Sequence, residues 1–587
     1  MRLQNSITRR QFLAQMGVAA SSLLLGACGQ RRVLRLTATP PPRPPPAATP
    51  APTIAPPPTP SVQPADQVLL GGKVVTMDAR DTIAQAVAVQ ADRVLAVGSD
   101  DEVRAFIGPE TQVLELAGKL VTPGLIDAHN HLQVWGTLLN DWVPLIPPEV
   151  RTLDQLLGRL SEALAQTPAG EWVQGYFWNV DPPSRADLDA ISPDNPVWLI
   201  QRGGHFGSCN TAALELAGIT AQTPNPPGGV IERDAAGVPT GRFYNHRAMD
   251  LVRRFAPQPT QEMIQANIRM AERRFAEVGV TTFQDCNARF SALQAYLEAG
   301  RQNSMTLRGD VFYTVEWKAD LERALNQIDP YADDFMRFSG YKFLIDGQFP
   351  TWYTHEPHAG IRWDMPTWDP KTFKEAVKAL HDTGFQIAVH CGGDAAVDLT
   401  LDAYEAAMNA NPRPDPRHRI EHATLCTQDA VRRMKDLAVV VSTQPQFIRF
   451  AQDLPEKLGD ERASRIMVTR DWLDAGITVA LGSDTPSAPW YEPQVTLVGA
   501  VLRPDADGQR YHPEQAMTIQ EALRAHTMGS AVAGHEERVK GSLEPDKFAD
   551  LAVWNEDLTR IRPAEILRAT TALTMIAGQT VYEEGGS

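Results

Sequence analysis

Short apolar runs bounded by glycine mark both ends of the globular part of the chain. Near its start they cover residues 68–77, 86–97 and 113–121, and near the C-terminus they cover 549–554 and 573–581. Their length and the glycines between them are typical of β-strands joined by turns. Both ends are therefore predicted to be rich in strands.

The middle of the chain alternates helical patterns with short apolar strands, which are expected at residues 340–345, 386–390, 439–442 and 478–482. A strand–helix alternation of this length is typical of a parallel (β/α)8 barrel. We therefore predict an α/β fold in which a (β/α)8, TIM-like barrel interrupts a small β-sandwich assembled from both ends of the globular part.

The domain boundaries follow from shifts in these patterns. The stretch from about 142 to 255 is too long for one barrel loop and contains a cluster of prolines and glycines, which predicts an inserted subdomain. The predicted division is a β-sandwich over 66–122, a barrel over 123–535 that contains this insertion, and the rest of the sandwich over 536–587.

The first 65 residues predict export. Arg9 and Arg10 precede an apolar run that ends in Leu25-Gly26-Ala27-Cys28, which resembles a twin-arginine (Tat) signal followed by a bacterial lipobox. An uncleaved membrane anchor is the alternative, but the apolar run of roughly fifteen residues is shorter than the ~20 that span a bilayer. We expect a signal over 1–28 and a lipid on Cys28.

Residues 29–65 are predicted to be a linker, because thirteen prolines lie between residues 39 and 65 and favour an extended spacer. The expected location is the outer face of the cytoplasmic membrane, and a periplasmic or outer-membrane location is the alternative. The lipid would then be the only contact with a membrane.

Composition narrows the class of partner. The chain has 71 acidic and 55 basic residues, a formal net charge of −16 and no basic stripe, which argues against nucleic acid. Its five cysteines form no C-x-x-C pair, so neither a zinc ribbon nor a redox dithiol is indicated. A small-molecule substrate is expected, and the oligomeric state is left open.

Five side chains that can bind a metal lie at the ends of predicted barrel strands. His129 and His131 are two residues apart in an extended segment, so both imidazoles can face one point. His390, His422 and Asp484 each end or follow another predicted strand. Barrel enzymes place their active sites at these strand ends, so the pattern predicts a metal centre. Zinc is the first expectation, and iron, manganese and nickel also suit this nitrogen and oxygen ligand set.

Several longer motifs resemble the amidohydrolase superfamily, in its YtcJ-like and N-substituted formamide deformylase-like branch. The resemblance covers about residues 67 to 583 and rests on the motifs GGKVVTM at 71–77, PGLIDAH at 123–129, RGGH at 202–205, GVTTFQD at 279–285, YKFLIDG at 341–347 and GSLEPDKFAD at 541–550.

The resemblance implies a role for each candidate residue. His129 and His131 would bind one divalent ion, His390 and His422 would bind a second, and Asp484 would bind the first and act as proton shuttle. Lys342 would be carboxylated and would bridge two ions. The alternatives for Lys342 are a surface lysine or an ion pair with Asp346, and an unmodified lysine would favour a single ion.

His205, in the RGGH motif, is a candidate second contact to the oxyanion or to the substrate, with a purely structural histidine as the alternative. His355 and His358 are two further histidines expected near the barrel mouth. Aromatic residues that could line an apolar substrate cavity are Trp172, Phe177, Trp178, Trp352, Tyr353, Trp363 and Trp490. A substrate with a hydrophobic group on nitrogen would fit such a cavity.

Together these features predict a metal-dependent amidohydrolase that cleaves a non-peptide C–N bond, of the amide or formamide type, with metal-activated water. Two alternatives stay open at this point. One is a hydrolase that uses the same metal site on a cyclic amide, an ester or a C–O bond. The other is a surface protein that binds a ligand without turnover.

Overall fold

The computed structural model describes residues 63–587 except 148, 179, 359–365 and 587. The predicted signal, its lipidation site Cys28, and all but the last residues of the proline-rich linker lie outside the described residues. Residues 64–587 form one compact unit. Within the part of the chain that is described, no helix combines the length and the apolar character needed to cross a membrane.

Eight parallel strands form the central sheet, and each pairs with the next strand of this sheet along the chain. In order they are β8 (Leu125–Asn130), β15 (Val280–Ala288), β16 (Arg308–Thr314), β17 (Met336–Leu344), β18 (Gln386–Cys391), β19 (Arg419–His422), β20 (Val440–Thr443) and β21 (Val479–Leu481). Helices connect most of these strands, among them α8 (Gln261–Ala276), α9 (Phe290–Arg301), α11 (Pro370–His381) and α12 (Asp394–Ala410). The predicted (β/α)8 barrel is confirmed.

The first and last strands come together just beyond their carboxyl ends. The backbone N–H of Asp484 donates to the carbonyl of His129 at 2.7 Å, and that of His131 donates to the carbonyl of Thr485 at 2.8 Å. Gly482 allows this close approach, because a Cβ at this position would lie 2.4 Å from the backbone nitrogen of His129. Closing the barrel therefore also places three candidate ligands beside one another.

The strands at the two ends of the globular part form two further sheets. One contains β1 (Gln67–Leu70), β4 (Ala86–Gln90), β5 (Arg93–Gly98) and β6 (Gln112–Glu115). The other contains β2 (Lys73–Val75), β3 (Ile83–Ala84), β7 (Leu120–Pro123), β22 (Leu551–Trp554), β23 (Thr571–Ile576) and β24 (Gln579–Glu583). In the second sheet β7 pairs antiparallel with β22, which joins the two ends of the globular part.

Apolar side chains from both sheets, such as Leu69, Val87 and Val553, share one buried core, as in a β-sandwich. The sandwich is also tied to the barrel. Arg308 at the start of β16 forms a buried ion pair with Asp550, with nitrogen–oxygen distances of 2.6 and 3.0 Å.

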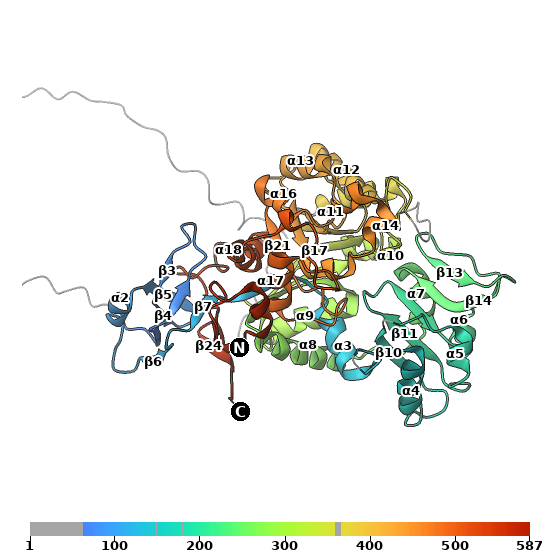
Figure 1. The fold of residues 1–587 in the computed structure, drawn as a ribbon, viewed down its shortest axis with the longest axis horizontal. Helices are drawn as coiled ribbons and strands as arrows, with labels where there is room; N and C mark the ends of the chain where they lie inside the picture. The colour runs from blue at the N-terminus through green and yellow to red at the C-terminus, as the bar shows by residue number, and fades with distance from the viewer. Residues whose placement is uncertain (1–62, 148, 179, 359–365, 587) are drawn as a thin grey trace, which may run out of the picture. The chain divides into compact units, whose positions relative to one another are not determined.

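A six-stranded mixed sheet lies between β8 and α8 in the chain. Its spatial order is β13 (Val230–Arg233), β14 (Pro239–Tyr244), β12 (Phe206–Cys209), β11 (Val197–Gln201), β10 (Val173–Trp178) and β9 (Val143–Pro144) (Figure 1). The same segment of the chain also contains helices, among them α4 (Leu153–Leu164) and α7 (His246–Arg253). Its buried apolar side chains form clusters separate from the main core. The sheet occupies the region where the sequence predicts an insertion.

Candidate metal centre

The candidate ligands come from separate strands and meet at the carboxyl-terminal mouth of the barrel. His129 lies in β8, Lys342 in β17 and His390 in β18, while His422 ends β19 and Asp484 follows β21. All five are buried. Parallel strands of a barrel all end at the same rim, so residues far apart in sequence converge there.

Asp484 lies between the two histidines of the H-x-H pair. Its Oδ1 atom is 3.4 Å from His129 Nε2 and 3.0 Å from His131 Nε2. The ring centroid of His422 lies 4.7 Å from that of His129 and 4.4 Å from that of His390. The structure therefore brings together all the histidines and the aspartate singled out in the sequence as metal ligands.

The cluster fits a metal ion, because one nitrogen that faces its centre is buried without a hydrogen-bond partner among the described residues. Potential ligand atoms of His129, His422 and Asp484 all lie within 4.8 Å of one another. The buried Nε2 of His129 has no hydrogen-bond partner among the described residues. Buried polar atoms are normally satisfied, so an unpaired nitrogen that faces a carboxylate suits a bound cation.

Two side chains that the sequence analysis did not single out orient the histidines. Glu421 Oε2 lies 2.5 Å from His129 Nδ1, and Gln444 Oε1 lies 2.6 Å from His422 Nδ1. Each contact engages Nδ1 and leaves Nε2 available to bind a metal ion. Metal-binding histidines usually have such a hydrogen-bond partner at the other ring nitrogen. Glu421 is itself held by the guanidinium of Arg419, at 2.7 Å from Nε.

The electrostatics of the cluster favour a positive charge beside Asp484 and neutral rings at His390 and His422. Burial opposes ionisation of Asp484, yet His129 and His131 beside it hold the pKa of this carboxyl well below its usual range. Burial, together with neighbouring His129, lowers the pKa of His422 to about 3, and burial beside His422 lowers that of His390 well below its usual value. Both rings are then neutral at physiological pH, the form that binds a metal.

Lys342 projects into the same cavity and is only 2% exposed. Its ammonium has no hydrogen bond or ion pair with any residue that the structure describes. Asp346 instead accepts hydrogen bonds from the backbone N–H groups of Gly392, Gly393 and Tyr353, at 2.8–2.9 Å. The alternative ion pair between Lys342 and Asp346 is therefore not formed, and Lys342 is not a surface residue.

His205 reaches the centre from the inserted sheet, between β11 and β12. Its ring centroid lies 5.1 Å from that of His390 and 4.9 Å from that of His246, a residue that the sequence analysis left unassigned. Burial lowers the pKa of His205 to about 4, so the ring is neutral. His355 and His358 line neither of the two main cavities of the barrel mouth, and His355 is 2.8 Å from Asp398.

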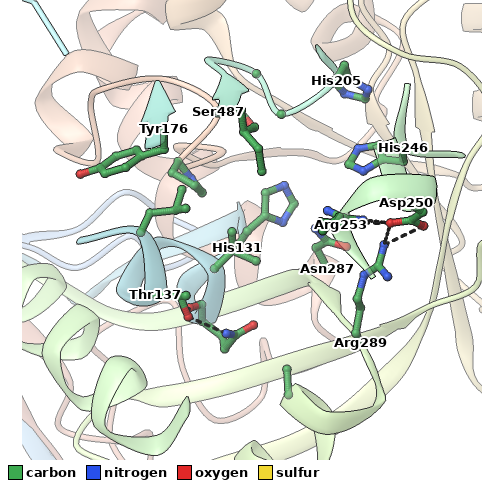
Figure 2. Close-up of a pocket in the computed structure, with 18 of the residues that line it drawn as sticks. His131, Thr137, Tyr176, His205, His246, Asp250, Arg253, Asn287, Arg289 and Ser487 are labelled. Atoms are coloured by element: carbon green, nitrogen blue, oxygen red, sulfur yellow. Dashed lines mark hydrogen bonds and ion pairs between the residues drawn. The ribbon is translucent and has the colours of Figure 1, made fainter. Parts of the chain in front are cut away.

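A cavity of about 720 Å³ opens beside the cluster and is lined by residues of both the barrel and the inserted sheet. Figure 2 shows His131, His205 and His246 among the side chains around it, together with Asp250 bonded to two arginines. This volume lies within the range of small-molecule sites. Of the aromatic residues predicted to line a substrate cavity, Phe177 lines this one.

The fold and the site together are those of a barrel hydrolase with a candidate metal centre at its mouth. The chain belongs to the amidohydrolase family, whose model matches residues 112–582. N-substituted formamide deformylase from Arthrobacter pascens is 30% identical over 547 residues, which cover 89% of this chain and 100% of that protein. YtcJ of Bacillus subtilis (strain 168) is 28% identical over 540 residues, which cover 88% of this chain and 99% of that protein.

Among solved structures, an uncharacterized metal-dependent hydrolase from Pyrococcus furiosus matches with a TM-score of 0.66 and 25% identity, over 84% of this chain and 100% of that one. These similarities confirm the predicted amidohydrolase superfamily and its YtcJ-like branch. The chain is therefore an enzyme of the class that hydrolyses carbon–nitrogen bonds other than peptide bonds, and it is metal-dependent.

Proposed function

We propose that this protein cleaves an amide- or formamide-type C–N bond of a small molecule with a metal-activated water, and that Asp484 is its acid–base catalyst. The observation that carries the proposal is the buried cluster in which potential ligand atoms of His129, His422 and Asp484 lie within 4.8 Å of one another. The relative from Arthrobacter pascens, named for its action on N-substituted formamides, supports this type of bond.

His129, His131 and Asp484 would hold one divalent ion, and His390 and His422 a second. Lys342 would bridge the two as a carbamate, since a buried ammonium without a partner is costly and carboxylation converts it into an oxygen ligand. Zinc suits these ligands, as do iron, manganese and nickel. When bound, such an ion supplies Lewis acidity to the attacking water and to the substrate carbonyl.

The chain's own residues would then move the protons. Asp484 takes a proton from the attacking water and later donates it to the leaving nitrogen, as general base and then general acid. The hydroxyl of Ser487 donates to Asp484 Oδ1 at 3.2 Å and helps to fix the carboxylate. Neutral His205, which carries an N–H at one ring nitrogen, can donate a hydrogen bond to the carbonyl oxygen as it becomes negative.

The test is hydrolysis of a panel of N-formyl and N-acyl amines by the zinc-loaded full chain and by Asp484→Asn. General acid–base catalysis contributes about 10²–10⁴-fold, so the variant should lose activity by that factor. Asp436→Asn, at an exposed helix end, is the matched control and should retain full activity. Wild-type activity in Asp484→Asn would refute the assigned role, and inertness of the wild type toward the whole panel would refute the proposed reaction.

We also propose that the enzyme is a Tat-exported lipoprotein tethered through Cys28. The twin-arginine pattern and the lipobox-like Leu25-Gly26-Ala27-Cys28 support this proposal. Labelled palmitate should enter the wild-type chain in bacterial cells but not Cys28→Ser. Equal labelling of both chains, or of neither, would contradict it.

A further inference from the structure

The candidate metal centre lies where two cavities meet. The first has a volume of about 720 Å³ and the second about 530 Å³. His205, His390, His422 and Asp484 line both of them. A reacting carbonyl held at these residues therefore has room on both of its sides.

The wall of the second cavity is aromatic. Its aromatic lining residues are Phe206, Phe349, Trp352, Phe447 and Phe450. Trp352 belongs to a buried apolar cluster against which Phe349 and Phe447 pack, and the rings of Phe349 and Trp352 meet edge to face at a centroid distance of 5.3 Å. Walls of this kind favour a flat apolar group, because ring–ring contacts add to the gain from burial.

Two cations, Arg202 and Lys457, also line the second cavity, and each has a ring or a carboxylate beside it. The guanidinium of Arg202 lies 3.8 Å from the ring centroid of Phe450. Lys457 Nζ lies 5.3 Å from the ring centroid of Phe349 and 3.6 Å from Asp453 Oδ2. Both cations line the cavity, so its aromatic wall also carries charged groups, each of which lies beside a ring or a carboxylate.

The first cavity is lined by apolar and aromatic side chains, such as Leu138, Tyr176 and Phe177, and by one cluster of charged residues. Arg253 and Arg289 both bond to Asp250 in its wall, as Figure 2 shows, and Arg289 also pairs with Glu316 at 2.9 Å. These two carboxylates offset Arg253 and Arg289, and Arg254 is a third guanidinium in the lining of this cavity. Such a wall suits a group that packs its apolar part against these side chains and ends in a polar, uncharged atom near the paired charges.

We propose that the substrate is an amide with a substantial group on each side of the scissile C–N bond, with an aromatic group in the second cavity and a group with a polar, uncharged end in the first. This inference rests on the proposed function. Water adds its oxygen to the acyl carbon, the C–N bond breaks, and a proton passes to nitrogen, which yields a carboxylic acid and an amine. A formamide has only a hydrogen on the acyl side of the C–N bond, so it could not fill both cavities.

The experiment compares kcat/KM of the zinc-loaded full chain on two-sided and one-sided amides. The two-sided probes are N-benzylglycolamide and N-(2-hydroxyethyl)phenylacetamide, which place the aromatic group on the amine and on the acyl side. The one-sided probes are N-benzylformamide, N-(2-hydroxyethyl)formamide and phenylacetamide. Because even small groups in a fitted pocket change kcat/KM by tenfold or more, one two-sided probe should exceed every one-sided probe at least about tenfold.

A matched pair of variants tests which cavity holds the aromatic group. Phe450→Ala removes part of the aromatic wall at a residue that is 39% exposed, so the fold should tolerate it. It should lower the ratio of kcat/KM between the favoured two-sided probe and N-(2-hydroxyethyl)formamide by about 2- to 10-fold. Phe255→Ala removes a phenylalanine of similar exposure, 44%, that lines neither cavity, and should leave the ratio unchanged.

The outcomes separate this inference from the function on which it rests. Hydrolysis of N-benzylformamide as fast as, or faster than, both two-sided probes overturns the two-sided substrate but leaves amide hydrolysis intact. An unchanged ratio in Phe450→Ala overturns the placement of the aromatic group. Failure to hydrolyse any probe overturns the proposed function and this inference with it.

Discussion

Glu421→Gln is the change that most directly links the architecture of the barrel to its metal centre. Glu421 is completely buried and accepts hydrogen bonds from Arg419 Nε at 2.7 Å and Nη2 at 2.9 Å, while its Oε2 lies 2.5 Å from His129 Nδ1. Glutamine keeps the shape of the side chain but loses the charge and one acceptor oxygen. Either Arg419 or His129 must then lose a partner.

These contacts determine how much stability and how much metal affinity the variant should lose. Removing one partner of a buried ion pair costs about 3–5 kcal/mol, and because glutamine keeps one acceptor we expect about 3 kcal/mol of lost stability. Loss of the group behind a metal-binding histidine typically lowers metal affinity by about 10- to 100-fold. His129 would no longer be fixed with Nε2 toward Asp484, so both effects should appear together.

Urea unfolding of the metal-free full chain measures the first effect, and competition with a chelator for Zn²⁺ measures the second. Glu461→Gln, the same exchange at an exposed helix position, should change neither quantity. A metal affinity within twofold of the wild type in folded Glu421→Gln would refute the claim that Glu421 orients His129 as a ligand. Unchanged stability would refute the energetic role of the buried pair.

Two other predictions test the barrel itself. Burial raises the pKa of Glu272 from 4.5 to about 7, so stability should fall as pH rises through that interval. The free energy of unfolding of Glu272→Gln should rise relative to that of the wild type by about 2 to 3 kcal/mol between pH 5 and pH 8. Parallel pH profiles of the two chains in urea unfolding would contradict this. A Cβ at Gly482 would lie 2.4 Å from the nitrogen of His129, so Gly482→Ala should cost about 1–3 kcal/mol and weaken Zn²⁺ binding. Wild-type affinity in chelator competition would show that the barrel closes without this glycine.

Local patterns were enough to predict the barrel and the polar residues at its rim. The predicted strands at 386–390 and 478–482 correspond to β18 and β21, and each leads directly to a candidate ligand, His390 or Asp484. An apolar run followed by a metal-binding side chain is a signal within a few residues, and the closure of a barrel then brings such residues together. The residues adjacent to each candidate ligand were therefore sufficient to predict most of the candidate metal centre.

Contacts between distant parts of the chain could not be predicted in this way. Glu421 orients His129 across 292 residues of sequence, and nothing near either residue indicates this pairing. The second cavity likewise combines Arg202 from the inserted segment with Phe450 and Lys457, more than 240 residues later. Of the predicted aromatic lining, Trp352 lies in this cavity, whereas Trp172, Trp178, Tyr353 and Trp490 line neither cavity and Trp363 lies outside the described residues.

The central claim is that this histidine and aspartate cluster binds the catalytic metal, and metal content per chain tests it most directly. Elemental mass spectrometry of the wild type and of Lys342→Ala, both prepared with carbonate present, counts the ions. We expect about two ions in the wild type and one or none in the variant, because the bridging carbamate is lost. About one ion in both chains would make Lys342 a structural residue, and no metal in the wild type would contradict the metal-dependent mechanism.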